Sequence, residues 1–164
     1  MKKIIKYLIR KFYTSKAKRI VAQYGESLRV NRNSIFTFNT IIGNNCHFNG
    51  MNVLGGGKVL FGDNFHSGPG CMIITSYHNY HGDSIPYDAT FINKDVLIGD
   101  NVWIGARVII LGGVTIGEGA IVQAGSVVVN DIPALSIAGG HPAKVFSHRD
   151  PEHYSEKKSL KKFH

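Results

Sequence analysis

The side chains best suited to chemistry lie in one stretch, residues 77–91. It contains two histidines and two aspartates, His78, His81, Asp83 and Asp88. Imidazole titrates near neutral pH, so either histidine could accept a proton from a substrate hydroxyl group. No serine or cysteine is arranged with a histidine in a way that suggests a covalent intermediate. The chemistry that these residues favour is therefore proton transfer by a general base.

The residues around this stretch follow a period of six. Large aliphatic residues recur at every sixth position, and small or β-branched residues follow each of them by four positions. The first set is Ile92, Ile98, Ile104, Ile110, Ile116, Val122 and Val128, and the second is Val96, Val102, Val108, Val114, Ala120, Ser126 and Ile132. This period fits neither a helix nor an alternating strand, and it is typical of a hexapeptide β-helix. The pattern predicts an all-β solenoid from which residues 77–91 project as a loop arm.

The same period begins weakly near Val30, before the arm. The expected inward residues are Phe36, Ile42, Phe48 and Leu54, with Ser34, Thr40, Cys46 and Asn52 in the small positions. One extra residue near the glycines at 55–57 marks a turn, and the period resumes at Phe61. Cys46 and Cys71 both occupy small inward positions, so we expect buried free thiols.

The positive charge of the chain lies at its two ends. The 164 residues carry a formal charge of +8, yet residues 1–19 alone have eight Lys or Arg and no acid. Residues 147–164 have a net charge of +2, and residues 20–146 a net charge of −2. A nucleic-acid-binding fold carries its basic face on the body of the domain. We therefore expect no nucleic-acid partner.

Residues 2–24 are expected to form a basic amphipathic helix. One arc of this helix contains Ile4, Ile5, Leu8, Ile9 and Phe12, and the opposite side is rich in lysine. The favoured interpretation is that the apolar arc packs on the end or side of the solenoid, or on a neighbouring subunit. The alternative is that residues 1–19 lie on an anionic membrane surface.

The chain therefore divides into three regions. A basic amphipathic helix occupies residues 1–24, and a β-helix domain occupies residues 25–146. Residues 147–164 form a basic C-terminal tail, for which the sequence allows either a short helix or a frayed end. No signal peptide and no stretch of transmembrane length is evident. The expected location is cytoplasmic, and peripheral at the inner face of the membrane if the N-terminal helix binds lipid.

Four motifs occur in order in the second half of the chain: NVWIGA at 101–106, GVTIG at 113–117, AGSVV at 124–128 and GHPAK at 140–144. This set resembles the hexapeptide-repeat acetyltransferases, and within them the maltose and galactoside O-acetyltransferases and related polysaccharide-biosynthesis enzymes. The resemblance implies a left-handed parallel β-helix, acetyl-CoA as acyl donor, and a homotrimer with active sites between subunits. The corresponding domain would be the acyltransferase domain.

The resemblance also implies that His78 is the general base. The family has Pro-Gly and then Thr-x-x-His at the entry to the arm, and this chain has Pro69-Gly70 followed by TSYH at 75–78. His81 is the second candidate. The other histidines considered, His47, His66 and His141, are expected in turns. A backbone N–H near Gly105 and Ala106 is the expected oxyanion donor.

The implied acetyl-CoA contacts carry over by position. They are Trp103, Gly105, Ala106, Ala124, Val129, Asn130 and Lys144. Ala106 matches a residue near the thioester, and Lys144 matches a basic residue near the nucleotide phosphates. Val129 and Asn130 stand where the family often has Thr-Lys, so one phosphate-facing lysine is missing. Weaker candidates for acceptor binding are Asn49, Asn52 and Asp83, each of which also suits an ordinary turn.

The expected activity is transfer of an acetyl group from acetyl-CoA to a hydroxyl of a saccharide, a small-molecule or oligosaccharide acceptor. The expected process is surface polysaccharide or oligosaccharide biosynthesis. One alternative keeps the fold and takes an amine or an antibiotic hydroxyl as acceptor, and another is a non-catalytic scaffold or glycan-binding module. A further alternative is a zinc enzyme similar to the γ-class carbonic anhydrases, with His66, His78 and His81 as ligands. Their spacing does not match that class, so no metal is expected.

Overall fold

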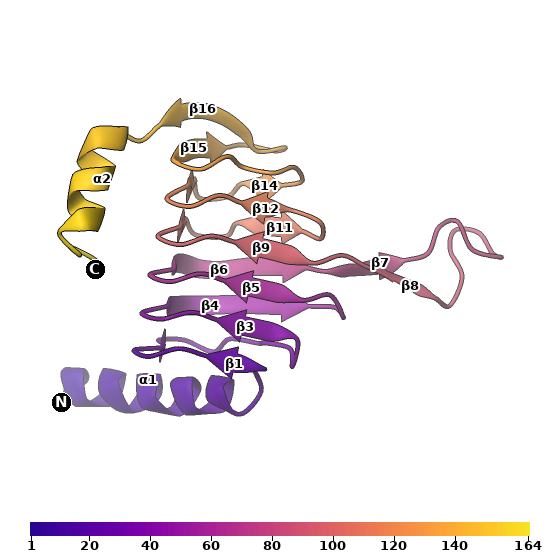
Figure 1. Cartoon of the computed structure of the whole chain (residues 1–164). Coiled ribbons are helices and arrows are strands. Elements are labelled where there is room, and N and C mark those ends of the chain that lie inside the picture. Colours follow the sequence, from indigo (N-terminus) through magenta and orange to yellow (C-terminus); the bar gives the residue numbers. More distant parts are fainter.

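The body of the protein is a left-handed parallel β-helix of about six turns, as predicted (Figure 1). The computed structural model describes residues 1–164, apart from the side chain of Lys2. One sheet contains, in order, β1 (Gln23–Tyr24), β3 (Thr40–Ile42), β5 (Val59–Phe61), β9 (Val96–Ile98) and β12 (Thr115–Ile116). Each strand pairs in parallel with the strand of the next turn, so the backbone hydrogen bonds run along the column.

A second sheet covers the rest of the column. Its strands are β2 (Arg29–Val30), β4 (His47–Leu54), β6 (His66–Ile74), β10 (Trp103–Ile104), β11 (Ile109–Leu111), β13 (Ile121–Val122), β14 (Val127–Val128), β15 (Ser136–Gly139) and β16 (Lys144–His148). The long strand β6 pairs with both β10 and β11, so it joins two faces of the column. The last strand, β16, runs antiparallel to β15 and ends the β-helix.

The period of six builds the core. The large aliphatic positions from Ile98 to Val128 are all buried, and so are the small positions that alternate with them. Ile92 is an exception, because it lies on an arm strand and is only partly buried. The inward stacking of aliphatic side chains in successive turns removes their surface from water, which is the main stabilising contribution in a fold of this type.

The prediction for the fourth inward pair is wrong by one residue. Met51 and Val53 are fully buried, whereas Asn52 is half-buried and Leu54 is exposed. The pairing of β4 with β6 changes register between His47 and Asn49, and the next residue, Gly50, has a φ of +106°. A glycine adopts this conformation without strain, so the chain can skip a position of the repeat there.

The arm is a β-hairpin that leaves the side of the column (Figure 1). Strand β7 (Ser76–His78) pairs antiparallel with β8 (Phe91–Asn93), and the intervening residues form the tip. The sequence predicted an arm over residues 77–91 without strands of its own. The antiparallel pairing supplies the backbone hydrogen bonds that a projecting loop would otherwise lack.

The N-terminal helix α1 (Lys2–Lys18) lies across the first turn of the column (Figure 1) and ends before the boundary expected at residue 24. Ala17 is buried against the column, and Thr14 Oγ1 accepts a hydrogen bond of 2.9 Å from the Val30 N–H. The apolar arc is exposed along its whole length at Ile4, Ile5, Leu8, Ile9 and Phe12. Packing of this arc on the chain's own column is therefore a wrong prediction.

The C-terminal region contains a helix, α2 (Pro151–Ser159), which runs back along the outside of the column (Figure 1). Asp150 caps it, because its carboxylate accepts from the Glu152 and His153 N–H groups at 2.9 and 3.1 Å. Tyr154 and Lys158 join the helix to Glu118 of the column. None of the helices in the described part of the chain is long and apolar enough to cross a membrane.

Candidate functional site

His78 is the last residue of β7 and lies on the exposed surface of the arm. Its ring stacks on that of Tyr87, with centroids 3.9 Å apart and planes 12° apart, and it also contacts Phe91 at 4.5 Å. These two aromatic rings orient the imidazole while leaving it accessible. A general base needs this combination of fixed orientation and access.

Asp88 organises the tip of the arm. Its carboxylate accepts hydrogen bonds from the Thr90 hydroxyl, the Thr90 N–H and the Asp83 N–H. The bonds from Thr90 hold the pKa of Asp88 below its ordinary value, with a smaller contribution from the charge of His78. Asp88 is therefore a carboxylate at neutral pH.

The proposed thioester end lies at a turn of closely stacked small residues. A side chain at Gly105 would lie 2.4 Å from Ala124 N, and one at Gly68 would lie 2.5 Å from Ala106 N. At Gly125 the same test meets no atom within 4 Å, so the outer edge of this turn is open. The turn is therefore closely packed at Gly68 and Gly105 and open to solvent at Gly125.

Two backbone donors at this turn are already engaged. The Gly105 N–H donates to Val122 O at 2.8 Å, and the Arg107 N–H donates to Pro69 O at 2.8 Å. The residue between them, Ala106, is half-buried. Of the two residues expected to supply an oxyanion donor, Ala106 is therefore the better candidate.

Trp103 lies on β10 beside this turn, with 53% of its surface exposed. It pairs in register with His66 on one side and Ile121 on the other. An exposed tryptophan on a flat strand surface can contact an apolar ligand or another subunit.

The remaining cofactor candidates lie further along the last turns. Val129 and Asn130 are exposed after β14, and Lys144 is exposed at the start of β16. Arg149 extends toward α2, where its guanidinium lies 5.2 Å above the Tyr154 ring. Lys144 is free to meet phosphates, whereas Arg149 is drawn toward the helix.

The acceptor candidates do not form one group. Asn49 is committed to the column, because it accepts from Asn31 Nδ2 at 3.1 Å and donates to Ser67 O at 2.6 Å. Asn52 lies on the same strand, and Asp83 lies on the arm. The bonds of Asn49 fit the structural role that its sequence context also allowed.

Several functional features were not visible in the sequence. The rings of Tyr87 and Phe91 surround His78, although they lie 9 and 13 positions further along the chain. His47 and His66, expected in turns, lie on β4 and β6. His66 therefore belongs to the column and His78 to the arm, so the zinc site imagined from His66, His78 and His81 does not assemble among the metal-ligating groups of the described residues.

The arm and the small-residue turn occupy different corners of the column. The arm leaves beside Gly57 and Gly112, both of which lie against Lys94 O. The small-residue turn is the corner of Gly68, Gly105 and Ala124. The arm projects from the side of the column (Figure 1), and His78 is the last residue of its first strand, β7.

Comparison with known proteins agrees with this architecture. The family described as "Bacterial transferase hexapeptide (six repeats)" matches residues 95–130. The galactoside O-acetyltransferase of Escherichia coli (strain K12) is 32% identical over 134 residues, which make up 80% of this chain and 60% of that protein. The chain thus spans only about three fifths of the length of that curated relative.

Solved structures show the same likeness. A maltose O-acetyltransferase from Clostridium difficile 630 has a TM-score of 0.64 and 33% identity, covering 78% of this chain and 67% of that one. A galactoside acetyltransferase in complex with coenzyme A has a TM-score of 0.71 and 28% identity, covering 85% and 71%. Because the chain shares the six-residue repeat, the β-helix and much of its sequence with these proteins, it belongs to the hexapeptide-repeat acetyltransferase family.

Proposed function

We propose that this protein is an acetyl-CoA-dependent O-acetyltransferase that acts on a saccharide hydroxyl in surface polysaccharide or oligosaccharide synthesis. Family membership supports the acyl transfer, and the relatives' names support a sugar acceptor. The observation that carries the proposal is the arm, which presents an accessible imidazole between two aromatic rings.

His78 acts as the general base in this proposal. Its neutral imidazole takes the proton of the acceptor hydroxyl while that oxygen attacks the thioester carbonyl. The Ala106 N–H donates to the oxyanion that develops, and the nearby Asp88 carboxylate stabilises the imidazolium. Collapse breaks the C–S bond, forms the ester, and returns the proton from His78 to the departing thiolate.

The donor is placed along the small-residue turn. Gly105, Ala106 and Ala124 leave an open edge for pantetheine, and Trp103 forms the neighbouring wall. Lys144 meets the nucleotide phosphates, while Val129 and Asn130 border the track without adding charge. No metal takes part in this acyl transfer.

The site is completed between subunits of a homotrimer. The arm carries His78 away from the turn of its own chain, so a neighbouring column has to supply the donor track. Repetition of this heterologous contact closes a ring of three.

Replacement of His78 by alanine tests the catalytic role. We expect His78→Ala to lower turnover by roughly 10²–10⁴-fold, the usual worth of a general base. Coenzyme A should still raise the melting temperature of the variant, because its binding residues are intact. The matched control is His81→Ala, and turnover is followed as release of free thiol over a panel of sugar acceptors.

Two results would overturn the proposal. Full turnover in His78→Ala would show that His78 is not the general base. A melting temperature that neither coenzyme A nor acetyl-CoA changes would favour a non-catalytic scaffold. A preference for amines over hydroxyls in the acceptor panel would change the acceptor class to that of the alternative enzyme.

We also propose that α1 rests on an anionic membrane surface through residues 1–19. The exposed apolar arc and the absence of acidic residues in this segment fit an interfacial helix. Flotation with anionic liposomes should carry the full chain upward, and Leu8→Gln should float less. The charge-preserving control is Lys3→Arg. If the full chain and a chain without residues 1–19 floated equally, the proposal that these residues bind the membrane would be wrong.

A further inference from the structure

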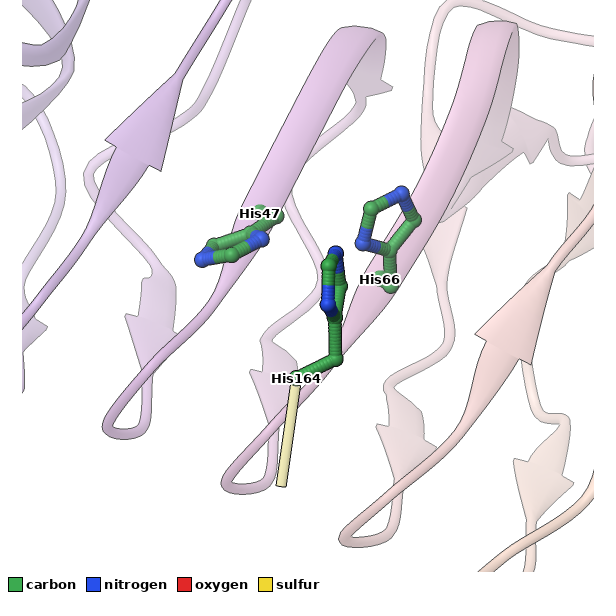
Figure 2. Close-up of side chains that lie close together, drawn as sticks. All are labelled: His47, His66 and His164. Atoms are coloured by element: carbon green, nitrogen blue, oxygen red, sulfur yellow. The ribbon is translucent and has the colours of Figure 1, made fainter. Parts of the chain in front are cut away.

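Three histidine rings converge on the side of the column (Figure 2), at a cavity that Trp103 also lines. His47 on β4 and His66 on β6 are directly paired in register, and His164 approaches them from the segment after α2. The ring centroids are 5.5, 6.0 and 6.1 Å apart. Each residue offers a nitrogen, and the three nitrogens lie within 4.8 Å of one another.

His47 has an unsatisfied nitrogen in this cluster. The residue is only 6% exposed, and its Nε2 has no hydrogen-bond partner among the described residues. A buried polar atom without a partner loses its hydrogen bond to water and gains none in return, so its presence calls for an explanation. A bound ligand at the centre of the cluster would supply the missing partner.

Two of the three histidines are shielded from water in the cluster. Burial lowers the pKa of His47 to about 4, with further lowering by nearby Arg29. Burial also lowers the pKa of His66. Burial thus favours the neutral form of both imidazoles, whose lone pair can bind a metal ion.

We propose that His47, His66 and His164 bind one divalent transition-metal ion of the Zn²⁺ type. Imidazole nitrogen suits Zn²⁺ and its neighbours in the transition series, whereas Mg²⁺ and Ca²⁺ prefer oxygen ligands. Tetrahedral Zn–N bonds of about 2.0–2.1 Å place the nitrogens about 3.4 Å apart, so the rings must close inward. His164, on the exposed segment after α2, can make this movement.

The surroundings indicate the fourth ligand. The cluster borders a cavity of about 480 Å³ between α2 and the column, lined also by Arg149, Lys157 and Lys162. These cations oppose a bare metal ion, and they favour an anionic ligand such as hydroxide or phosphate in the open position. The histidines would then hold the metal ion, and the lysines and the arginine would face its anionic ligand.

The consequence is a metal-dependent clamp. Asn45 Nδ2 already donates to His164 O at 2.9 Å, which brings the end of this segment to the column. A metal shared by two strands of the column and His164 would fix the whole α2 segment in place. This inference does not rest on the proposed acyl transfer, because neither His78 nor the small-residue turn takes part.

Metal titration of tag-free protein, stripped with EDTA, tests the clamp. Zn²⁺ binding is measured by competition with a chromophoric chelator, and Co²⁺ is added as a spectroscopic probe of tetrahedral nitrogen ligation. We expect one ion per chain. His66→Ala and His164→Ala should each weaken binding by at least about 10-fold, since each removes one of three protein ligands. His153 is an exposed histidine that lines the same cavity, and the His153→Ala variant should bind Zn²⁺ as tightly as the unmodified chain does.

A second readout follows the segment itself. Zn²⁺ should slow hydrogen exchange in α2 of the unmodified chain but not in His164→Ala, and Mg²⁺ should have no effect. Absence of stoichiometric Zn²⁺ binding would overturn the proposal. So would equal affinity in His164→Ala and His153→Ala, because the ion would then bind elsewhere.

Discussion

The histidines of this protein differ in what surrounds them, and that difference separates their chemistry. His78 is exposed and lies between aromatic rings on the arm, so its lone pair can reach a substrate. His47 is enclosed in the column and its ring meets other imidazoles. An exposed imidazole suits proton transfer, whereas converging neutral imidazoles suit metal ligation.

The two cysteines behave as small apolar residues. Cys46 and Cys71 are completely buried, as the repeat predicted. Burial raises the pKa of Cys46 to about 12 and also raises the pKa of Cys71. The thiols are therefore protonated at neutral pH, and neither is suited to nucleophilic attack.

A thiol count checks this at the residue scale. We expect native protein at pH 8 to show no thiol reactive toward a chromogenic disulfide reagent, and denatured protein to show both. Cys46→Ala and Cys71→Ala should each remove one thiol from the denatured count. Rapid labelling of a native thiol would contradict the burial of that residue.

Among the elements, α2 depends on one charged contact. Glu118 accepts hydrogen bonds from Lys158 and from the Tyr154 hydroxyl, and these contacts lower the pKa of Glu118. A carboxyl whose folded pKa is depressed contributes stability above its unfolded pKa, near 4.5. That contribution disappears as the pH falls through the folded pKa.

Hydrogen exchange of α2 tests this contact at the element scale. After correction for intrinsic rates, we expect the α2 amides to lose protection at pH 4 or below relative to pH 7. Glu118→Gln should lose part of that protection already at pH 7, because the ion pair is absent. Asp83→Asn, which changes a carboxyl on the arm, is the control. Protection that is the same in Glu118→Gln and the unmodified chain would show that α2 is attached by other contacts.

At the scale of the whole molecule, the column separates the arm that carries His78 from the small-residue turn of the proposed donor track. The arm begins at the corner of Gly57 and Gly112, and the small-residue turn is the corner of Gly105 and Ala124. A rigid column keeps these corners apart, which is why we propose that a complete site is formed by two copies of the chain.

Complementation between two inactive variants tests this at the molecular scale. His78→Ala lacks the base, and Ala124→Trp blocks the track, so each alone should be nearly inactive. Refolded together in equal amounts, they should recover about a quarter of the original turnover, because each mixed trimer contains one intact interface out of three. A mixture no more active than its components would place both halves in one chain.

Much of the fold could be predicted because its pattern is local. Each turn of the column stacks on the next with the same inward side chains, so Ile98, Ile104 and Ile110 report the architecture through spacing alone. The prediction failed where the repeat departs from its period. The register of β4 shifts between His47 and Asn49, and no feature of residues 48–54 shows which side chains then face inward.

The sequence by itself determined the repeat, the arm and the candidate base at its entry, since neighbouring residues and fixed spacing carry that information. The tertiary structure alone decided which distant residues meet. His164 reaches His47 and His66 because α2 turns back along the column, and Tyr87 reaches His78 because the arm folds on itself. Such contacts depend on the path of the chain through space, and the period of the sequence does not encode that path.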